Sequence, residues 1–101
     1  MDHVVLLKVK PGATEAEIQN LIDGAKSLVA VPGVESVSVG PTFVEEWMSD
    51  RRAGITHAIS VRLQSKDALR SYQDHPLHVS VRDTIFKPLL TGPPIAVDWE
   101  F

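Results

Sequence analysis

The chain has 101 residues, a net charge of −3, four histidines and no cysteine. Its 44% hydrophobic and 23% charged residues are ordinary for a globular domain, so we expect one domain over residues 1–101. The charge gives no support for nucleic acid or an anionic membrane as a partner. The lack of cysteine excludes disulfides, thiolate metal sites and a thiol nucleophile, and it fits a cytoplasmic protein.

The first predicted element is a strand over His3–Lys10, a run of β-branched and long apolar residues that stops at a Pro-Gly pair. Alternation places His3, Val5 and Leu7 on one face of this strand. The apolar run is too short to span a membrane and carries no cleavage pattern. We therefore interpret it as a strand and not as a signal peptide.

A helix is predicted next, because Thr14 and Glu17 form a capping box before a run with helical periodicity. This helix should end before Pro32 and Gly33. Its apolar stripe consists of Ile18, Leu21, Ile22, Ala25, Leu28 and Val29.

Two further strands follow, one beginning at Val34 and one over residues 55–64, with a charged loop over Val44–Gly54 between them. Alternation in the second of these strands puts His57 beside Ile59 on an apolar face. A lone histidine in such a place is usually a buried neutral residue with one hydrogen-bond partner. A structural role for His57 therefore stands beside a functional one.

The second helical region should be split. Ser65 suits the N-cap of a short helix, and His75 precedes a proline that disfavours helical geometry at this position. Pro76 then suits the first turn of a new helix, which carries His78 on its inner stripe and is kinked or ended by Pro88. A last strand is predicted in residues 94–101.

This order predicts an α+β chain with the ferredoxin-like β-α-β-β-α-β arrangement and a split second helical region. Four antiparallel strands then take helices on one face. The other face should mix Val4, Leu6, Ala58 and Ala96 with polar groups, and nothing in the chain covers it. We therefore expect a homodimer that packs sheet against sheet.

Four proton-handling side chains should converge between helices and sheet: His3, His57, Tyr72 and His78. Each costs free energy unless it is paired, and a core does not need so many, so together they favour a functional pocket. Zinc is disfavoured, because a proline breaks the helix between His75 and His78 and no cysteine or acidic residue completes a ligand set.

Three segments resemble the stress-responsive dimeric A/B barrel (Dabb) family: HVVLLKVK at the start, GITHAISVRL in the middle, and YQDHPLHV after the short helix. The resemblance covers nearly the whole chain, and the His-Pro-x-His element is its most specific part. It implies that two ferredoxin-like chains join through their sheets into a dimeric α+β barrel with the helices outside.

Resemblance to the plant polyketide cyclases of this family implies a catalytic pair at Tyr72 and His78. It also implies substrate contacts at His3, His57 and His75. We expect the pocket wall to include Val5, Leu7, Ile22, Ile59 and Val81. The cyclases carry aromatic residues on the first helix where this chain has Leu21, Ile22 and Ala25, which predicts a wider pocket and either a different acyl chain or a different ligand altogether.

Some family members imply Mg²⁺ held by main-chain carbonyls, and the matching residues here are Val31, Val34 and Val37. Carbonyl oxygens suit a hard cation, but valine side chains add no signature of their own. No other cofactor is expected.

The function that these residues support is a cofactor-independent polyketide cyclase performing an intramolecular aldol condensation. His78 would be the base, and Tyr72 would donate to the carbonyl oxygen that gains charge. One alternative is a non-catalytic stress or defence protein that binds a hydrophobic ligand. Another is a cofactor-independent monooxygenase of the dimeric α+β barrel type. All three would take a small hydrophobic or polyketide-like ligand.

Overall fold

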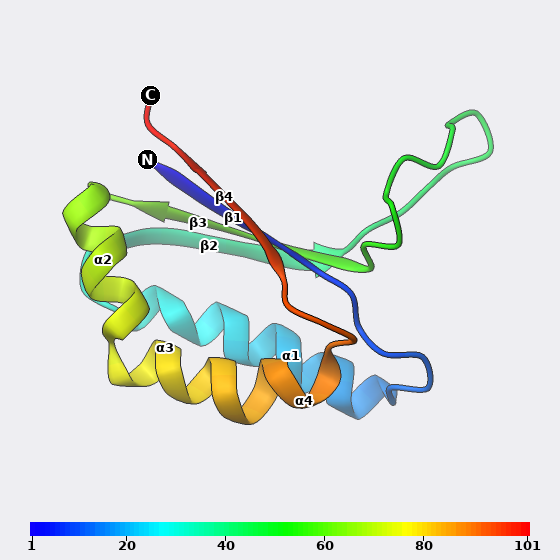
Figure 1. Cartoon of the computed structure of the whole chain (residues 1–101), viewed down its shortest axis with the longest axis horizontal. Helices are drawn as coiled ribbons and strands as arrows, with labels where there is room; N and C mark the ends of the chain where they lie inside the picture. The colour runs from blue at the N-terminus through cyan, green and yellow to red at the C-terminus, as the bar shows by residue number, and fades with distance from the viewer.

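Four strands form one antiparallel sheet in the order β2-β3-β1-β4 in the computed structural model, which describes residues 1–101 (Figure 1). The strands are β1 (Asp2–Leu7), β2 (Val34–Pro41), β3 (His57–Leu63) and β4 (Ile95–Trp99). The helical elements are α1 (Glu15–Ser27), η1 (Leu28–Ala30), α2 (Lys66–Asp74), α3 (Pro76–Val81), η2 (Arg82–Phe86) and α4 (Lys87–Leu89). The predicted α+β, ferredoxin-like order is confirmed.

The first helix begins at the predicted capping box. The Thr14 hydroxyl accepts the Glu17 backbone N–H at 3.1 Å, and the Glu17 carboxylate accepts the Thr14 backbone N–H at 3.0 Å. These two bonds satisfy donors that every helix start leaves free, so α1 begins at a defined residue. The stripe led by Leu21 and Ala25 is then buried against the sheet.

The second helical region breaks at His75, as predicted. His75 is extended, with φ −64° and ψ 135°, and its ring Nδ1 accepts the Leu77 backbone N–H at 3.1 Å. Beyond α3 the helix widens into the π-helical turn η2 and ends shortly after Pro88. A proline has no N–H to donate and clashes with the carbonyl four residues earlier, and a wider turn accommodates it.

The helices cover one face of the sheet, and the core lies between them. On β3 the residues that face the helices are buried and alternate with exposed or half-buried ones. The buried hydrophobic residues of this core are Leu7, Leu21, Ala25, Leu28, Val31, Ile59, Val61, Leu63, Tyr72, Val81, Phe86 and Leu89.

The opposite, open face is more apolar than the sequence predicted, and the placement of Ala96 on it was wrong. Ala96 pairs with Val5 of β1 and therefore faces the helix side. The same register puts Ile95, Val97 and Trp99 on the open face, where they are 51%, 50% and 47% exposed. Alternation separates the two faces of a strand but does not say which one meets the helices.

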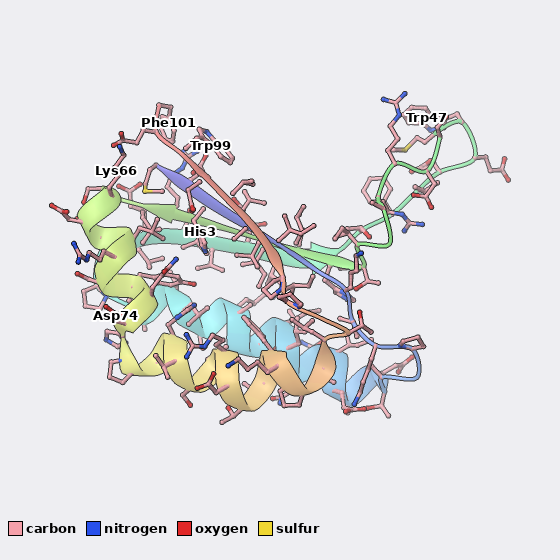
Figure 2. The ribbon with its side chains drawn as sticks, viewed as in Figure 1. His3, Trp47, Lys66, Asp74, Trp99 and Phe101 are labelled. Atoms are coloured by element: carbon pink, nitrogen blue, oxygen red, sulfur yellow. The ribbon has the colours of Figure 1, made fainter.

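Residues between β2 and β3 project from the sheet as an extended loop (Figure 1). Trp47 lies on this loop, far from the labelled residues of β1 and β4 (Figure 2), and is 81% exposed. The predicted loop over Val44–Gly54 is thus confirmed. None of the helices is long and apolar enough to cross a bilayer.

Candidate functional site

Tyr72 lies at the centre of a group of aromatic side chains from three elements. Its ring centroid is 4.5 Å from that of His78 on α3 and 5.9 Å from that of His3 on β1. Tyr72 is 2% exposed and His3 is 4% exposed, whereas His78 is half-buried. The structure therefore brings together three of the four residues that we expected to converge.

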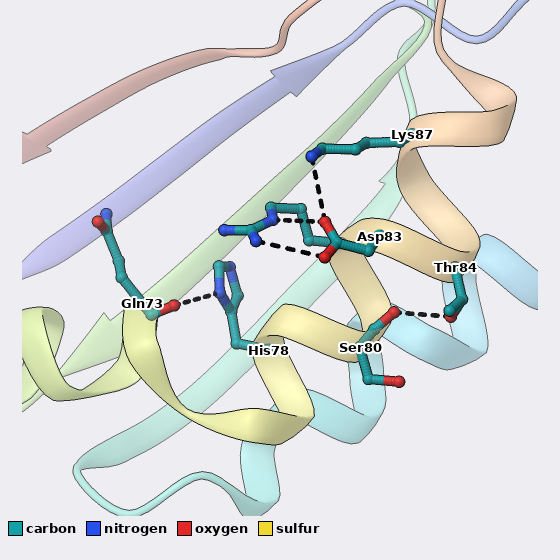
Figure 3. Close-up of polar contacts among 7 residues, drawn as sticks. Gln73, His78, Ser80, Asp83, Thr84 and Lys87 are labelled. Atoms are coloured by element: carbon teal, nitrogen blue, oxygen red, sulfur yellow. Dashed lines mark hydrogen bonds and ion pairs between the residues drawn. The ribbon is translucent and has the colours of Figure 1, made fainter.

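The break between α2 and α3 is what turns His78 toward Tyr72. The chain bends at His75, and His78 Nδ1 then lies 3.0 Å from the Gln73 carbonyl oxygen (Figure 3). A carbonyl oxygen can only accept, so in this bond Nδ1 carries the hydrogen. The lone pair of a neutral His78 is then on Nε2, the atom that can take a proton from a ligand.

The surroundings of His78 favour its neutral form. Burial lowers the pKa of His78 and the positive charge of Arg82 lowers it further, while the hydrogen bond to the Gln73 carbonyl and the negative charge of Asp83 oppose them. The imidazole is therefore neutral near pH 7 and available as a base.

The Tyr72 hydroxyl makes no hydrogen bond to another group of the chain. No fully buried side-chain polar atom lacks a partner, so the phenol oxygen must reach a solvent-accessible spot although its ring is buried. Burial raises the pKa of Tyr72 to about 12. The phenol therefore stays protonated and can donate to a ligand.

Asp98 joins this group and was not anticipated from the sequence. Its carboxylate contacts Nδ1 of His3, which it faces across the β1–β4 pair. The Asp98 side chain is 39% exposed and lies in the wall of a groove of about 280 Å³. The other residues of this groove are Met1, Lys66, Leu69, Trp99 and Glu100. The polar group thus reaches the surface beside β4.

His57 does not join the group. In the β1–β3 ladder His57 pairs with Leu7, and His3 pairs with Val61 four positions away. At the usual rise of a strand, the backbones of the two pairs are about 13 Å apart. Whether a single cavity reaches all four residues therefore stays a prediction. His57 is 6% exposed, and burial lowers its pKa.

A local hydrogen-bond network explains His57. Its Nδ1 lies 2.9 Å from the Thr56 hydroxyl oxygen, which also accepts the Val9 backbone N–H at 2.9 Å. The same hydroxyl donates to the Leu7 carbonyl at 3.3 Å, so it accepts a hydrogen from His57. These bonds link β1 to β3. They favour the structural role for His57. A structural role is likewise favoured for His75, whose ring accepts the Leu77 backbone N–H at the start of α3.

The five expected wall residues all lie in or against the core: Val5, Leu7, Ile22, Ile59 and Val81. A hollow of about 500 Å³ lies elsewhere, on the projecting loop. Its walls are Phe43, Val44, Trp47, Met48, Ser49, Arg51 and Arg52. Whether the five residues line a ligand pocket stays a prediction.

No group of three or more His, Asp or Glu side chains is placed to hold a metal ion. Of the three carbonyls expected to hold Mg²⁺, that of Val31 already accepts the Val34 backbone N–H at 3.1 Å. The magnesium site therefore stays a prediction, and no chemical step below uses it.

Comparison with known proteins places the whole chain in one family. The model of the Stress responsive A/B Barrel Domain matches residues 1–101. A stress-response A/B barrel domain-containing protein of Arabidopsis thaliana is 30% identical over 98% of the chain, which spans only 36% of that protein. Olivetolic acid cyclase of Cannabis sativa is 28% identical over 80% of the chain and 78% of its own length.

Solved structures agree with the fold. A crystal structure of an Arabidopsis thaliana protein, 29% identical, superposes with a TM-score of 0.85 over 98% of this chain and 92% of the other. A dimeric ferredoxin-like protein of unknown function from Thermobifida fusca, 24% identical, gives a TM-score of 0.74 over 95% and 85% of the two chains.

Proposed function

The chain belongs to the stress-responsive A/B barrel domain family, and from that premise we propose that it is a cofactor-independent polyketide cyclase. The observation that carries the proposal is the buried Tyr72, whose ring lies against the imidazoles of both His3 and His78 and whose hydroxyl has no hydrogen-bond partner in the chain. Buried hydroxyls usually bond to another protein group or to ordered water, so a hydroxyl with no partner in the chain is available to a ligand. The similarity to olivetolic acid cyclase over 80% of the chain supports the same chemistry.

In the proposed reaction, His78 Nε2 removes a proton from a methylene group between two carbonyls of the substrate. The electron pair left on that carbon attacks a second carbonyl carbon of the same molecule and forms the new carbon–carbon bond. The displaced carbonyl pair moves onto its oxygen, which accepts a hydrogen bond from the Tyr72 hydroxyl. The imidazolium then returns its proton to this oxygen and gives a neutral aldol product.

Two further groups would assist. The contact with Asp98 orients the His3 ring, which is T-shaped to the Tyr72 ring, and His3 could then donate to a second substrate carbonyl. Apolar walls would hold a flexible chain folded with its reacting carbons close together, which contributes rate through orientation.

We propose that the active form is a homodimer. The open face carries Ile95, Val97 and Trp99, each about half exposed, and no helix of the same chain covers them. A related fold from Thermobifida fusca is described as dimeric. Sedimentation at micromolar concentration should give twice the chain mass of 11.1 kDa, and Val97→Glu should give the monomer. A wild-type protein that sediments as a monomer would contradict the proposed dimeric barrel.

The function is tested by incubating the protein with a linear tetraketide, supplied both as the CoA thioester and as the free acid, and separating the products. The expected product is a cyclised isomer that forms faster than it does without protein. Saturable binding without turnover would instead support the non-catalytic stress-protein function. A product that has gained oxygen would support the monooxygenase.

A further inference from the structure

Arg82 is the first residue of the π-helical turn and lies one turn after His78. Its backbone N–H donates to the His78 carbonyl, so the two residues occupy adjacent turns of a continuous helix. Side chains four apart on a helix share a face, with Cβ atoms about 5–6 Å apart. The guanidinium can therefore reach a ligand held by His78. π-Helical turns are rare and frequent at functional sites.

The charges around Arg82 do not cancel. Its Nε and Nη2 lie 2.9 and 3.5 Å from the two carboxylate oxygens of Asp83, and Lys87 Nζ lies 3.2 Å from one of the same oxygens. Two cations thus share one carboxylate, which leaves one positive charge in excess beside His78. Figure 3 shows Asp83 and Lys87 on the side of the helix that carries His78, with Ser80 and Thr84 turned away.

Arg82 is also free to change partner. Its side chain is 43% exposed, and the bonds to Asp83 leave other guanidinium N–H groups unused. If Arg82 turned toward a ligand, Asp83 would keep its ion pair with Lys87. Exposed ion pairs of this kind contribute little to stability, so the exchange costs little.

We propose that Arg82 determines substrate specificity by binding a carboxylate of the substrate. This inference rests on the proposed function and assigns its substrate class: a β-dicarbonyl acid whose carboxylate lies about one helical turn from the carbon that His78 deprotonates. An arginine fork suits this task because it pairs with a carboxylate through two parallel hydrogen bonds.

The test compares two ligands that differ only in charge, 3,5-dioxohexanoate and its methyl ester. Binding is followed through the ring signals of His78 in NMR spectra, without any need for turnover. We expect wild type to bind the acid about 10- to 100-fold more tightly than the ester, the size of a charge-assisted hydrogen bond. Arg82→Gln should remove this preference and leave ester binding unchanged, and Arg82→Lys should keep part of it.

The matched control is Arg70→Gln, an exposed arginine on α2, which should leave both affinities unchanged. The melting temperature of each variant shows that the fold is intact. The inference is overturned if wild type binds the ester as tightly as the acid, or if Arg82→Gln keeps the preference. It is also overturned if only Lys87→Gln abolishes the preference. If Arg82 selects the acid but no β-dicarbonyl substrate is ever cyclised, the carboxylate site stands and the proposed cyclase fails.

Discussion

Two histidines on the same side of the sheet, His3 and His57, are almost equally buried but have different polar surroundings. Both face the helices and are only 4% and 6% exposed. His57 lies at one end of the β1–β3 ladder, where its Nδ1 bonds to the hydroxyl of the neighbouring Thr56. His3 lies at the other end, against a carboxylate from β4 and the ring of Tyr72. Burial therefore does not distinguish a structural histidine from a functional one.

What distinguishes the two ends is whether their polar atoms are already paired. At the His57 end, the Thr56 hydroxyl serves the His57 ring, a backbone N–H and a backbone carbonyl. At the His3 end, the Tyr72 hydroxyl has no partner in the chain. We infer that the first end holds strands together and that the second binds a ligand. The following predictions test this contrast.

The largest effect is expected for His78→Ala. A general base typically contributes about 10²–10⁴ in rate, so the cyclisation rate should fall by that factor while the dimer persists. Steady-state kinetics on the linear tetraketide that the wild type cyclises, with sedimentation of the same sample, measures both. An unchanged rate in a folded dimer would leave His78 without a catalytic role.

Tyr72→Phe should lower kcat by about 10²–10³, as the loss of one donor to an oxyanion usually does. The same change should leave the melting temperature almost unaltered, because the hydroxyl has no partner in the chain to lose. Differential scanning calorimetry and single-turnover kinetics separate the two effects. A marked drop in melting temperature with no loss of rate would make Tyr72 a structural residue.

Thr56→Val should show the opposite pattern at the other end of the ladder. The Val9 N–H and the His57 ring would lose their acceptor, which should cost about 1–3 kcal/mol in the free energy of unfolding. The cyclisation rate should stay within about twofold of wild type, since the site lies four ladder positions away. Urea unfolding gives the stability. A rate loss as large as that expected for Tyr72→Phe would contradict a purely structural role for His57 and indicate that it belongs to the active site.

The smallest effect is a loss of stability in mild acid. Burial lowers the pKa values of His57 and His78 from the ordinary 6.5, so the unfolded chain binds protons first as the pH falls. The free energy of unfolding should therefore begin to fall near pH 6.5 and keep falling until the pH drops below the folded pKa values. Urea unfolding at stepped pH measures this, and His57→Leu should reduce the slope. An identical slope in that variant would contradict a buried neutral His57.

The sequence predicted most of the elements, because each start and stop has a local cause. The Thr14 capping box, the Ser65 cap and the break at His75 all depend on neighbouring residues. The contact between Tyr72 and His78 could also be predicted, because the two residues are only six positions apart on either side of the helix break. Such features can be deduced without knowing the tertiary structure.

The errors share one cause, which is the unknown register between distant strands. Alternation gave His57 and His3 the same face but could not place them at opposite ends of the ladder. Asp98 was missed because it meets His3 only once β4 pairs with β1, 95 residues away. Ala96 was assigned to the wrong face for the same reason.

The central claim is that ligands bind at the His3, Tyr72 and His78 end of the sheet and not at the His57 end. The most direct measurement follows the four imidazole ring signals by NMR while a β-dicarbonyl acid such as 3,5-dioxohexanoate is added. The account predicts that the signals of His78 and His3 shift together and saturate, while those of His57 and His75 stay in place. A saturating shift confined to His57, or no shift of any ring at millimolar ligand, would contradict it.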